Sequence, residues 1–281
     1  MKRIIKITIL YITLILVQTS FYGCNNMTKS TATQSENEHA SNSIDLSNMI
    51  MLADTTFEGH QVSLWTPDSL TNKFESLYLK FEDGKGNPVS DLAVDYEITM
   101  DMGMMAHGGP YSPLVNKGKG IYQADVVFIM ANMKDMGKGW LFKTLLKGKD
   151  KSDTLTFALP VQQTTIPRTI ATGTTTDDRV FVSCLIPNEV ESGKHNIEFA
   201  LHKMDKETFT NLDGYTIAVE PFMPAMKHGS PENKDAESKG NGRYSGLVNF
   251  TMSGDWVIRV KLMKNGKTVS QDSLVYPIKI K

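Results

Sequence analysis

The sequence predicts an all-β protein, and three observations support this prediction. Between turn signals, short segments alternate between apolar and polar residues, which is the pattern of strands with one buried face. No segment carries a long helical period. An internal repeat divides the chain, and each copy has its own tryptophan, Trp140 and Trp256. Six or seven short strands in about 110 residues around a buried tryptophan are typical of an immunoglobulin-like β-sandwich, so we predict two such sandwiches in tandem.

The predicted strands form two matching sets. In the first copy they cover residues 62–65, 74–81, 93–100, 121–130, 140–146 and 155–161. In the second copy they cover residues 180–186, 196–202, 215–220, 244–252, 256–263 and 273–280. Turns rich in Gly, Asn, Asp and Lys separate them.

The repeat is clearest in a methionine-rich segment of each copy. Residues 96–108 read YEITMDMGMMAHG, and residues 215–229 read YTIAVEPFMPAMKHG. The patterns Gly-x-Tyr, Phe-x-Met and Gly shortly before Trp then follow in both copies in the same order. This alignment matches Met102 with Met223, Met105 with Met226, His107 with His228, Met100 with Pro221 and Met104 with Ala225. The first copy carries extra residues at 131–138, which we interpret as an enlarged hairpin loop.

The N-terminus has the layout of a secretory signal. Lys2, Arg3 and Lys6 precede an apolar run at residues 7–17, about half of the roughly 20 residues that a membrane-spanning helix needs. Gly23 before Cys24 resembles the lipobox of bacterial lipoproteins. We therefore predict a signal peptide at residues 1–23 and lipidation of Cys24. The alternative is a plain signal peptide that happens to contain a cysteine.

The remaining chain divides at changes of composition. Residues 24–48 are rich in Ser, Thr, Asn and Gln and predict a disordered tether. The first sandwich is assigned to residues 49–162, a threonine-rich linker to residues 163–177, and the second sandwich to residues 178–281. A lipid anchor on such a tether would hold both sandwiches in the cell envelope beside a membrane. Asn25 is not the Asp that favours inner-membrane retention, which favours the outer membrane over the inner one.

Charge and motif content exclude two classes of function. The chain has 30 Lys and Arg against 31 Asp and Glu, interleaved along the sequence, so it offers no basic face for nucleic acid. A His-Glu-x-x-His pattern, a Gly-x-Ser-x-Gly elbow and a phosphate-binding glycine loop are all missing from the sequence, so we predict that the protein is not an enzyme. Cys184 is expected to be a buried thiol, and His195 and His202 are expected on the surface.

Each copy offers two methionines and one histidine at matched positions. Thioether and imidazole groups suit Cu(I), and methionine functions where exported thiols would be oxidised. A spacing of three and then two residues cannot place all three side chains on one face of a flat strand, so the chain must turn there. Gly103 and Pro224 favour such a turn. The predicted metal ligands are Met102, Met105 and His107 in the first copy, and Met223, Met226 and His228 in the second.

Two other interpretations of these residues stay open. The methionines could fill the core of one strand, with the His-Gly pair closing a turn and its ring packed against Trp140 or Trp256. They could also form a methionine-rich surface that contacts another protein. If the loop at residues 131–138 folds over the site, Met130, Met133 and Met136 could add sulfur ligands. Tyr122, Phe128 and Trp140 are expected in the core.

The repeated motif Met-x-x-Met-x-His-Gly, followed by Gly-x-Tyr, Phe-x-Met and Gly before Trp, resembles YtkA-like domains and, more distantly, the periplasmic part of FixH proteins. The second copy departs from this pattern by one residue, with Pro224 in place of Gly103. The resemblance implies small β-sandwiches of the bacterial envelope with a copper-handling role. The alternative function is a structural module that presents two sandwiches to a membrane complex of metal efflux or respiratory oxidase assembly, without metal.

Overall fold

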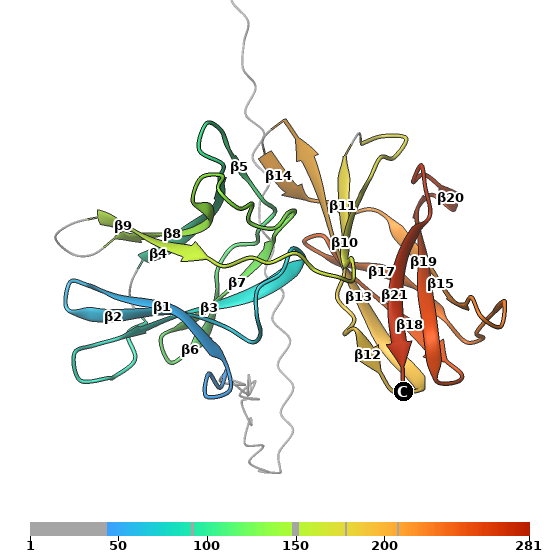
Figure 1. Cartoon of the computed structure of the whole chain (residues 1–281), viewed down its shortest axis with the longest axis horizontal. Helices are drawn as coiled ribbons and strands as arrows, with labels where there is room; N and C mark the ends of the chain where they lie inside the picture. The colour runs from blue at the N-terminus through green and yellow to red at the C-terminus, as the bar shows by residue number, and fades with distance from the viewer. Residues whose placement is uncertain (1–43, 91–92, 148–151, 178, 207) are drawn as a thin grey trace, which may run out of the picture. The chain divides into compact units, whose positions relative to one another are not determined.

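The computed structural model describes residues 44–90, 93–147, 152–177, 179–206 and 208–281. All of these belong to one compact unit, Ser41–Lys281. The predicted signal peptide, Cys24 and the tether up to residue 43 lie outside the described residues. The described part of the chain consists of strands and turns without a helix, so the predicted all-β class is confirmed (Figure 1). Within these residues, no helix has the length and apolar character needed to span a bilayer.

The first copy folds into two antiparallel sheets that enclose one core. The first sheet has the order β1-β2-β3-β7-β6 and contains β1 (Ile50–Phe57), β2 (His60–Thr66), β3 (Phe74–Glu82), β7 (Ile121–Val127) and β6 (Val115–Gly118). The second has the order β5-β4-β8-β9 and contains β5 (Ala106–Gly108), β4 (Ala93–Asp101), β8 (Gly139–Lys147) and β9 (Ser152–Leu159). The core holds Trp140, Phe128 and Phe142, all fully buried.

The second copy, yellow to red in Figure 1, forms a 12-stranded sheet that folds around its own core. The order β10-β11-β13-β18-β17-β15-β19-β21-β12 runs through β10 (Thr169–Thr172), β11 (Val180–Cys184), β13 (Gly193–Asp205), β18 (Arg243–Phe250), β17 (Lys234–Gly240), β15 (Thr216–Met223), β19 (Gly254–Lys264), β21 (Leu274–Ile280) and β12 (Glu189–Val190). The short strands β14 (Thr208–Asn211), β16 (His228–Gly229) and β20 (Lys267–Thr268) pair with β13, β15 and β19. Because β17 pairs with both β18 and β15, it joins the two layers into one sheet.

The two copies share one strand order. The series β1-β2-β3-β7-β6 reappears as β10-β11-β13-β18-β17, and β5-β4-β8-β9 reappears as β16-β15-β19-β21. All twelve predicted strands are present, and each places apolar side chains in a core. Tyr122, Phe128 and Trp140 are buried as predicted, and so are their counterparts Tyr244, Phe250 and Trp256. Burial of each such side chain contributes roughly 1.5–3 kcal/mol.

The structure differs from the sequence prediction between β7 and β8. These strands lie in different sheets, so residues 131–138 cross between layers, and the prediction of a hairpin loop was wrong. Asn132 anchors this crossing: its Nδ2 donates to the Leu159 carbonyl at 2.7 Å, and its Oδ1 accepts from the Trp140 backbone at 3.0 Å. Leu159 and Trp140 both belong to the sheet β5-β4-β8-β9, so these bonds tie the crossing segment to that sheet.

The structure also describes parts of two segments that were assigned no strand. Residues 169–172, within the predicted linker, form β10 and pair with β11. Leu46, near the end of the predicted tether, is buried in a small cluster with Tyr78 and Ile121. Strand pairing and apolar contact thus extend each sandwich beyond the boundary that composition indicated.

Candidate functional site

A turn between β4 and β5 presents the methionine-rich segment of the first copy. Met100 in β4 pairs with His107 in β5 on one side and with Trp140 in β8 on the other. The chain leaves the strand after Asp101, as predicted: Gly103 adopts a φ of 82°, and the Met102 N–H donates to the Met105 carbonyl at 2.9 Å. The turn therefore brings His107 back beside the strand that carries Met100.

His107 is held by three contacts. Its ring packs edge-on against Trp140, with centroids 5.5 Å apart. Its Nδ1 lies 2.7 Å from the Gly108 carbonyl oxygen, which can only accept, so Nδ1 carries the proton. In the neutral ring Nε2 then keeps its lone pair, and Nε2 lies 3.3 Å from the Met130 sulfur. The Met130 carbonyl in turn accepts a hydrogen bond from Trp140 Nε1 at 2.8 Å, which fixes the position of this residue.

The structure places the other predicted ligands of this copy differently. Met102 is half-buried against the core, whereas Met105 is 65% exposed. Among the described contacts, the sulfur that reaches His107 belongs to Met130, a residue that the sequence suggested as an additional ligand. His107 and Met130 also line one cavity of about 320 Å³, together with Ile129, Arg179, Phe181, Met204 and Phe209.

The two methionine-rich loops of the first copy lie against each other. Gly137 has a φ of 62°, and a β-carbon there would collide with backbone atoms of Asp101 and Gly103. This close backbone approach couples the turn at residues 102–105 to the crossing at residues 131–138. Met104 and Met136 are exposed on these loops.

The second copy repeats the histidine and tryptophan geometry. The ring of His228 packs edge-on against Trp256 at 5.7 Å, and its Nδ1 lies 2.7 Å from the Gly229 carbonyl. Trp256 Nε1 donates to the Met252 carbonyl at 3.0 Å. Met223 is buried, Met226 is 61% exposed, and Met252 is 40% exposed. The interpretation that each histidine ring packs on its tryptophan is confirmed in both copies.

The structure corrects the alignment of the two copies at this site. Met223 pairs with His228 as Met100 pairs with His107, and both methionines are buried. The pairing of Phe222 with Val257 brings Met223 opposite Trp256 at the next position, as Met100 is opposite Trp140. The match of Met102 with Met223 was therefore wrong. Six residues separate Met100 from His107, and four separate Met223 from His228. Because the turn is two residues longer in the first copy, an alignment without a gap matches the wrong methionines.

Other candidate side chains are structural. In the described part of the chain, no group of three or more His, Cys, Asp or Glu side chains is placed to hold a metal ion. Cys184 is a buried free thiol, as predicted, and burial raises its pKa to about 11, which keeps it protonated at neutral pH. The expectation that His202 lies on the surface was wrong: it is 4% exposed, at a position where β13 is flanked in the sheet by β11 and β14.

Comparisons with solved structures show likeness over most of the chain at low similarity. An Escherichia coli adhesin, FdeC, has 18% identity and a TM-score of 0.25, with 82% of this chain and 66% of that chain covered. A conserved domain protein from Bacillus anthracis has 14% identity and a TM-score of 0.30, covering 82% and 90%. Salmonella alpha-2-macroglobulin has 12% identity and a TM-score of 0.26, covering 84% and 16%. At these values the likeness carries no functional meaning.

The family comparison is more specific. The curated proteins that were compared include no match to this chain. A family model described as YtkA-like matches residues 176–273, which run through the second sandwich from before β11 to the residue before β21. The first sandwich lies outside this match and shares the strand order of the second. The chain is thus a β-sandwich protein, and its residues 176–273 match the YtkA-like family model.

Proposed function

We propose that the protein is a membrane-anchored envelope lipoprotein that binds Cu(I), with its main site at His107 and Met130. The observation that carries this proposal is the contact of 3.3 Å between His107 Nε2 and the Met130 sulfur. Because Nδ1 is committed to the Gly108 carbonyl, the lone pair of Nε2 in the neutral ring faces a second electron-pair donor. A soft cation between them would turn this contact into coordination.

The donor set fits Cu(I) better than Zn(II). Thioether sulfur is a soft ligand that favours Cu(I), whereas zinc sites use histidine, thiolate and carboxylate. The edge of Trp140 and the half-buried setting limit access of water to the ring. Met102 and Met105 in the turn, and Met133 and Met136 in the crossing loop, are the candidates for a third ligand. Cu(I) supplies no reaction here, so the proposed role is binding and delivery.

The second copy offers the matching residues His228, Met223 and Met226, with Met252 at the position of Met130. The His228 ring has the same tautomer-fixing contact as His107, to the Gly229 carbonyl. Met252 is exposed and Met223 is packed in the core, so fewer sulfur atoms are held near this ring. We propose a weaker second site.

Anaerobic titration of residues 25–281 with Cu(I), in competition with a chromogenic chelator, tests the proposal. We expect one tight and one weaker site, and far weaker Zn(II) binding. Replacement of His107 and His228 together by Phe, which keeps the aromatic contact with each tryptophan, should abolish tight binding. Failure of the intact protein to compete with the chelator would contradict the metal function.

A second candidate function is a protein-contact module without metal. The observation in its favour is the exposure of Met104, Met105 and Met136 on two adjoining loops, because flexible methionines suit adaptable interfaces. A membrane complex of metal transport or oxidase assembly is the partner that we propose in either case. Retention of such a partner by the double His variant would separate contact from metal binding.

The proposed anchor rests on Cys24 and the signal before it. Acylation would supply the membrane affinity, with the outer membrane favoured over the inner one. Cys24→Ser should move the protein to the soluble fraction or leave its signal uncleaved. An unchanged membrane fraction with a cleaved signal would contradict lipidation at this residue.

A further inference from the structure

The cavity that His107 and Met130 line is shared with the second sandwich. Its volume is about 320 Å³, and its other lining residues are Ile129 from the first sandwich and Arg179, Phe181, Met204 and Phe209 from the second. Both sandwiches belong to one compact unit, Ser41–Lys281. The proposed Cu(I) donors of the first sandwich therefore share one space with side chains of β11, β13 and β14.

Two contacts hold the second sandwich against this part of the first. The Phe209 ring comes within 4.0 Å of the position that a β-carbon on Gly108 would occupy, and the Gly108 carbonyl lies 2.7 Å from His107 Nδ1. In β18, Arg243 Nη1 lies 3.9 Å from the Asp125 carboxylate at the end of β7. The second sandwich thus packs on the residue that orients the His107 ring.

Met204 brings a second thioether to this cavity. It lies half-buried in β13, where its backbone N–H donates to the Arg179 carbonyl at 3.0 Å and its backbone pairs with Phe209 of β14. These contacts fix the backbone, while the flexible methionine side chain lets the sulfur adjust to a ligand. Among the lining residues, only His107, Met130 and Met204 carry a donor suited to Cu(I). Met102 and Met105 do not line this cavity.

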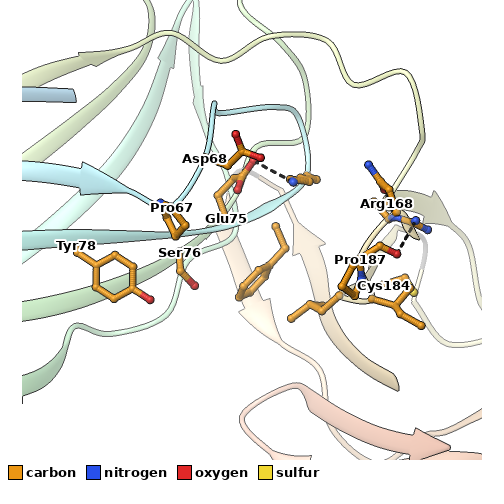
Figure 2. Close-up of a pocket in the computed structure, with 13 residues that line it drawn as sticks. Pro67, Asp68, Glu75, Ser76, Tyr78, Arg168, Cys184 and Pro187 are labelled. Atoms are coloured by element: carbon orange, nitrogen blue, oxygen red, sulfur yellow. Dashed lines mark hydrogen bonds and ion pairs between the residues drawn. The ribbon is translucent and has the colours of Figure 1, made fainter. Parts of the chain in front are cut away.

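A larger cavity, also lined by both sandwiches, has a different chemistry. Its volume is about 510 Å³, and Figure 2 shows Asp68, Glu75, Ser76 and Tyr78 on one side and Arg168, Cys184 and Pro187 on the other. Carboxylate and hydroxyl oxygens are hard ligands, and the one sulfur in this lining belongs to Cys184, a thiol that burial keeps protonated. A soft cation is therefore expected in the cavity with two thioethers.

Arg179 adds a positive charge to the wall of the smaller cavity. Its guanidinium carbon lies 5.3 Å from the centre of the Phe181 ring, which lines the same cavity. At a given distance a doubly charged ion meets twice the Coulomb repulsion that a singly charged ion meets. The charge of this wall therefore favours Cu(I) over Zn(II), in the same direction as the thioether donors.

We propose that Met204 of the second sandwich is the third ligand of the ion held by His107 and Met130, an inference that rests on the proposed Cu(I) function. The resulting set is one imidazole and two thioethers, which are neutral donors suited to Cu(I). Met204 lies outside the repeated methionine and histidine motif. The bound ion would link the two sandwiches, so the second sandwich would contribute to the affinity of the first site.

Competition titration of residues 25–281 with Cu(I) tests the assignment. Met204→Leu removes the sulfur but keeps an apolar side chain of similar volume, and it should weaken binding at the tight site at least tenfold. Met263→Leu is the matched control, because Met263 is also a half-buried methionine of the second sandwich but does not line the cavity. Equal affinity of Met204→Leu and the unaltered chain would overturn this inference and leave the proposed function in place. Absence of Cu(I) binding by the unaltered chain would contradict both.

If Met204→Leu does not fold, NMR of the unaltered chain with labelled methyl groups provides the second measurement. Cu(I) is diamagnetic, so methyl resonances of its ligands can be followed during the titration. The ε-methyl resonances of Met130 and Met204 should shift together with the first equivalent of Cu(I). The Ile129 methyl groups are the control, because Ile129 lines the same cavity without a donor atom. A shift of Met204 no larger than that of Ile129, while Met130 shifts, would show that Met204 is not a ligand.

Discussion

The Nε2 atom of His107 lies 3.3 Å from the Met130 sulfur, although His107 belongs to one sheet of the first sandwich and Met130 follows a strand of the other. His107 lies in β5, whereas Met130 follows β7 at the start of the crossing to β8. Contacts with the Trp140 ring and with the Gly108 carbonyl orient the His107 ring. The two donor atoms are therefore brought together by the packing of the sandwich, which lowers the ordering cost of binding an ion.

Met130→Leu should weaken Cu(I) binding at the first site by at least tenfold, because it removes the sulfur while retaining an apolar side chain of similar volume. Met104→Leu is the matched control, since Met104 is fully exposed and has no described contact with His107. Competition titration with each variant provides the measurement. Equal affinities for the two variants would show that Met130 is not a ligand.

Gly137→Ala should destabilise the first sandwich by more than about 1 kcal/mol, because its β-carbon would collide with the backbone of Asp101 and Gly103. Gly86→Ala is the control, since Gly86 has a similar positive φ, 83° against 62°, but open space around it. Urea unfolding of both variants separates the collision from the cost of the φ angle. A difference near zero would mean that the two loops do not hold each other.

The stability of the second sandwich should fall as the pH drops from about 6.5 to about 4. Burial, with a smaller contribution from Arg243, lowers the pKa of His202 from 6.5 to about 4. Between these pH values His202 is protonated in the unfolded chain and neutral in the folded chain. The stability that His202 contributes is therefore fully present above its unfolded pKa of 6.5 and declines as the pH falls below it. The loss from this residue is at most about 3 kcal/mol.

Chemical denaturation of the unaltered protein and of His202→Leu at pH 7.5 and pH 4.5 measures this contribution. Nδ1 of His202 has no hydrogen-bond partner, so leucine breaks no bond at that atom. The drop in unfolding free energy between the two pH values should be smaller in the variant. The same drop in both proteins would show that His202 is not responsible.

The two sandwiches should fold as separate fragments, residues 44–165 and 166–281. Each has its own core and its own buried tryptophan. The fragment 44–165 retains the hydrogen bond from the Thr164 backbone N–H to Asn72 Oδ1. The fragment 166–281 retains the pairing of β10 with β11. Cooperative urea unfolding, followed by tryptophan fluorescence, is the measurement. Loss of cooperativity in both fragments would contradict independent folding.

Prediction from sequence succeeded where one face of a strand is apolar and failed where it is not. The strands β4, β19 and β21 alternate buried residues with half-buried or exposed ones, and all three were predicted. β17 reads KDAESKG and buries only Ala236, so its pairing with β15 and β18 comes from backbone hydrogen bonds that composition does not reveal. β1 likewise buries only one residue, Phe57.

The sequence by itself determined the all-β class, the tandem repeat, the buried tryptophans and the turn at Gly103, because alternation and the conformational freedom of glycine are local properties. Only the tertiary structure decided that Met100 corresponds to Met223 and that Met130 reaches His107. A methionine-rich segment can be aligned in several ways, and the correct alignment depends on which residue lies opposite the tryptophan of the neighbouring strand. Contacts between sheets depend on packing across the core, which no local pattern contains.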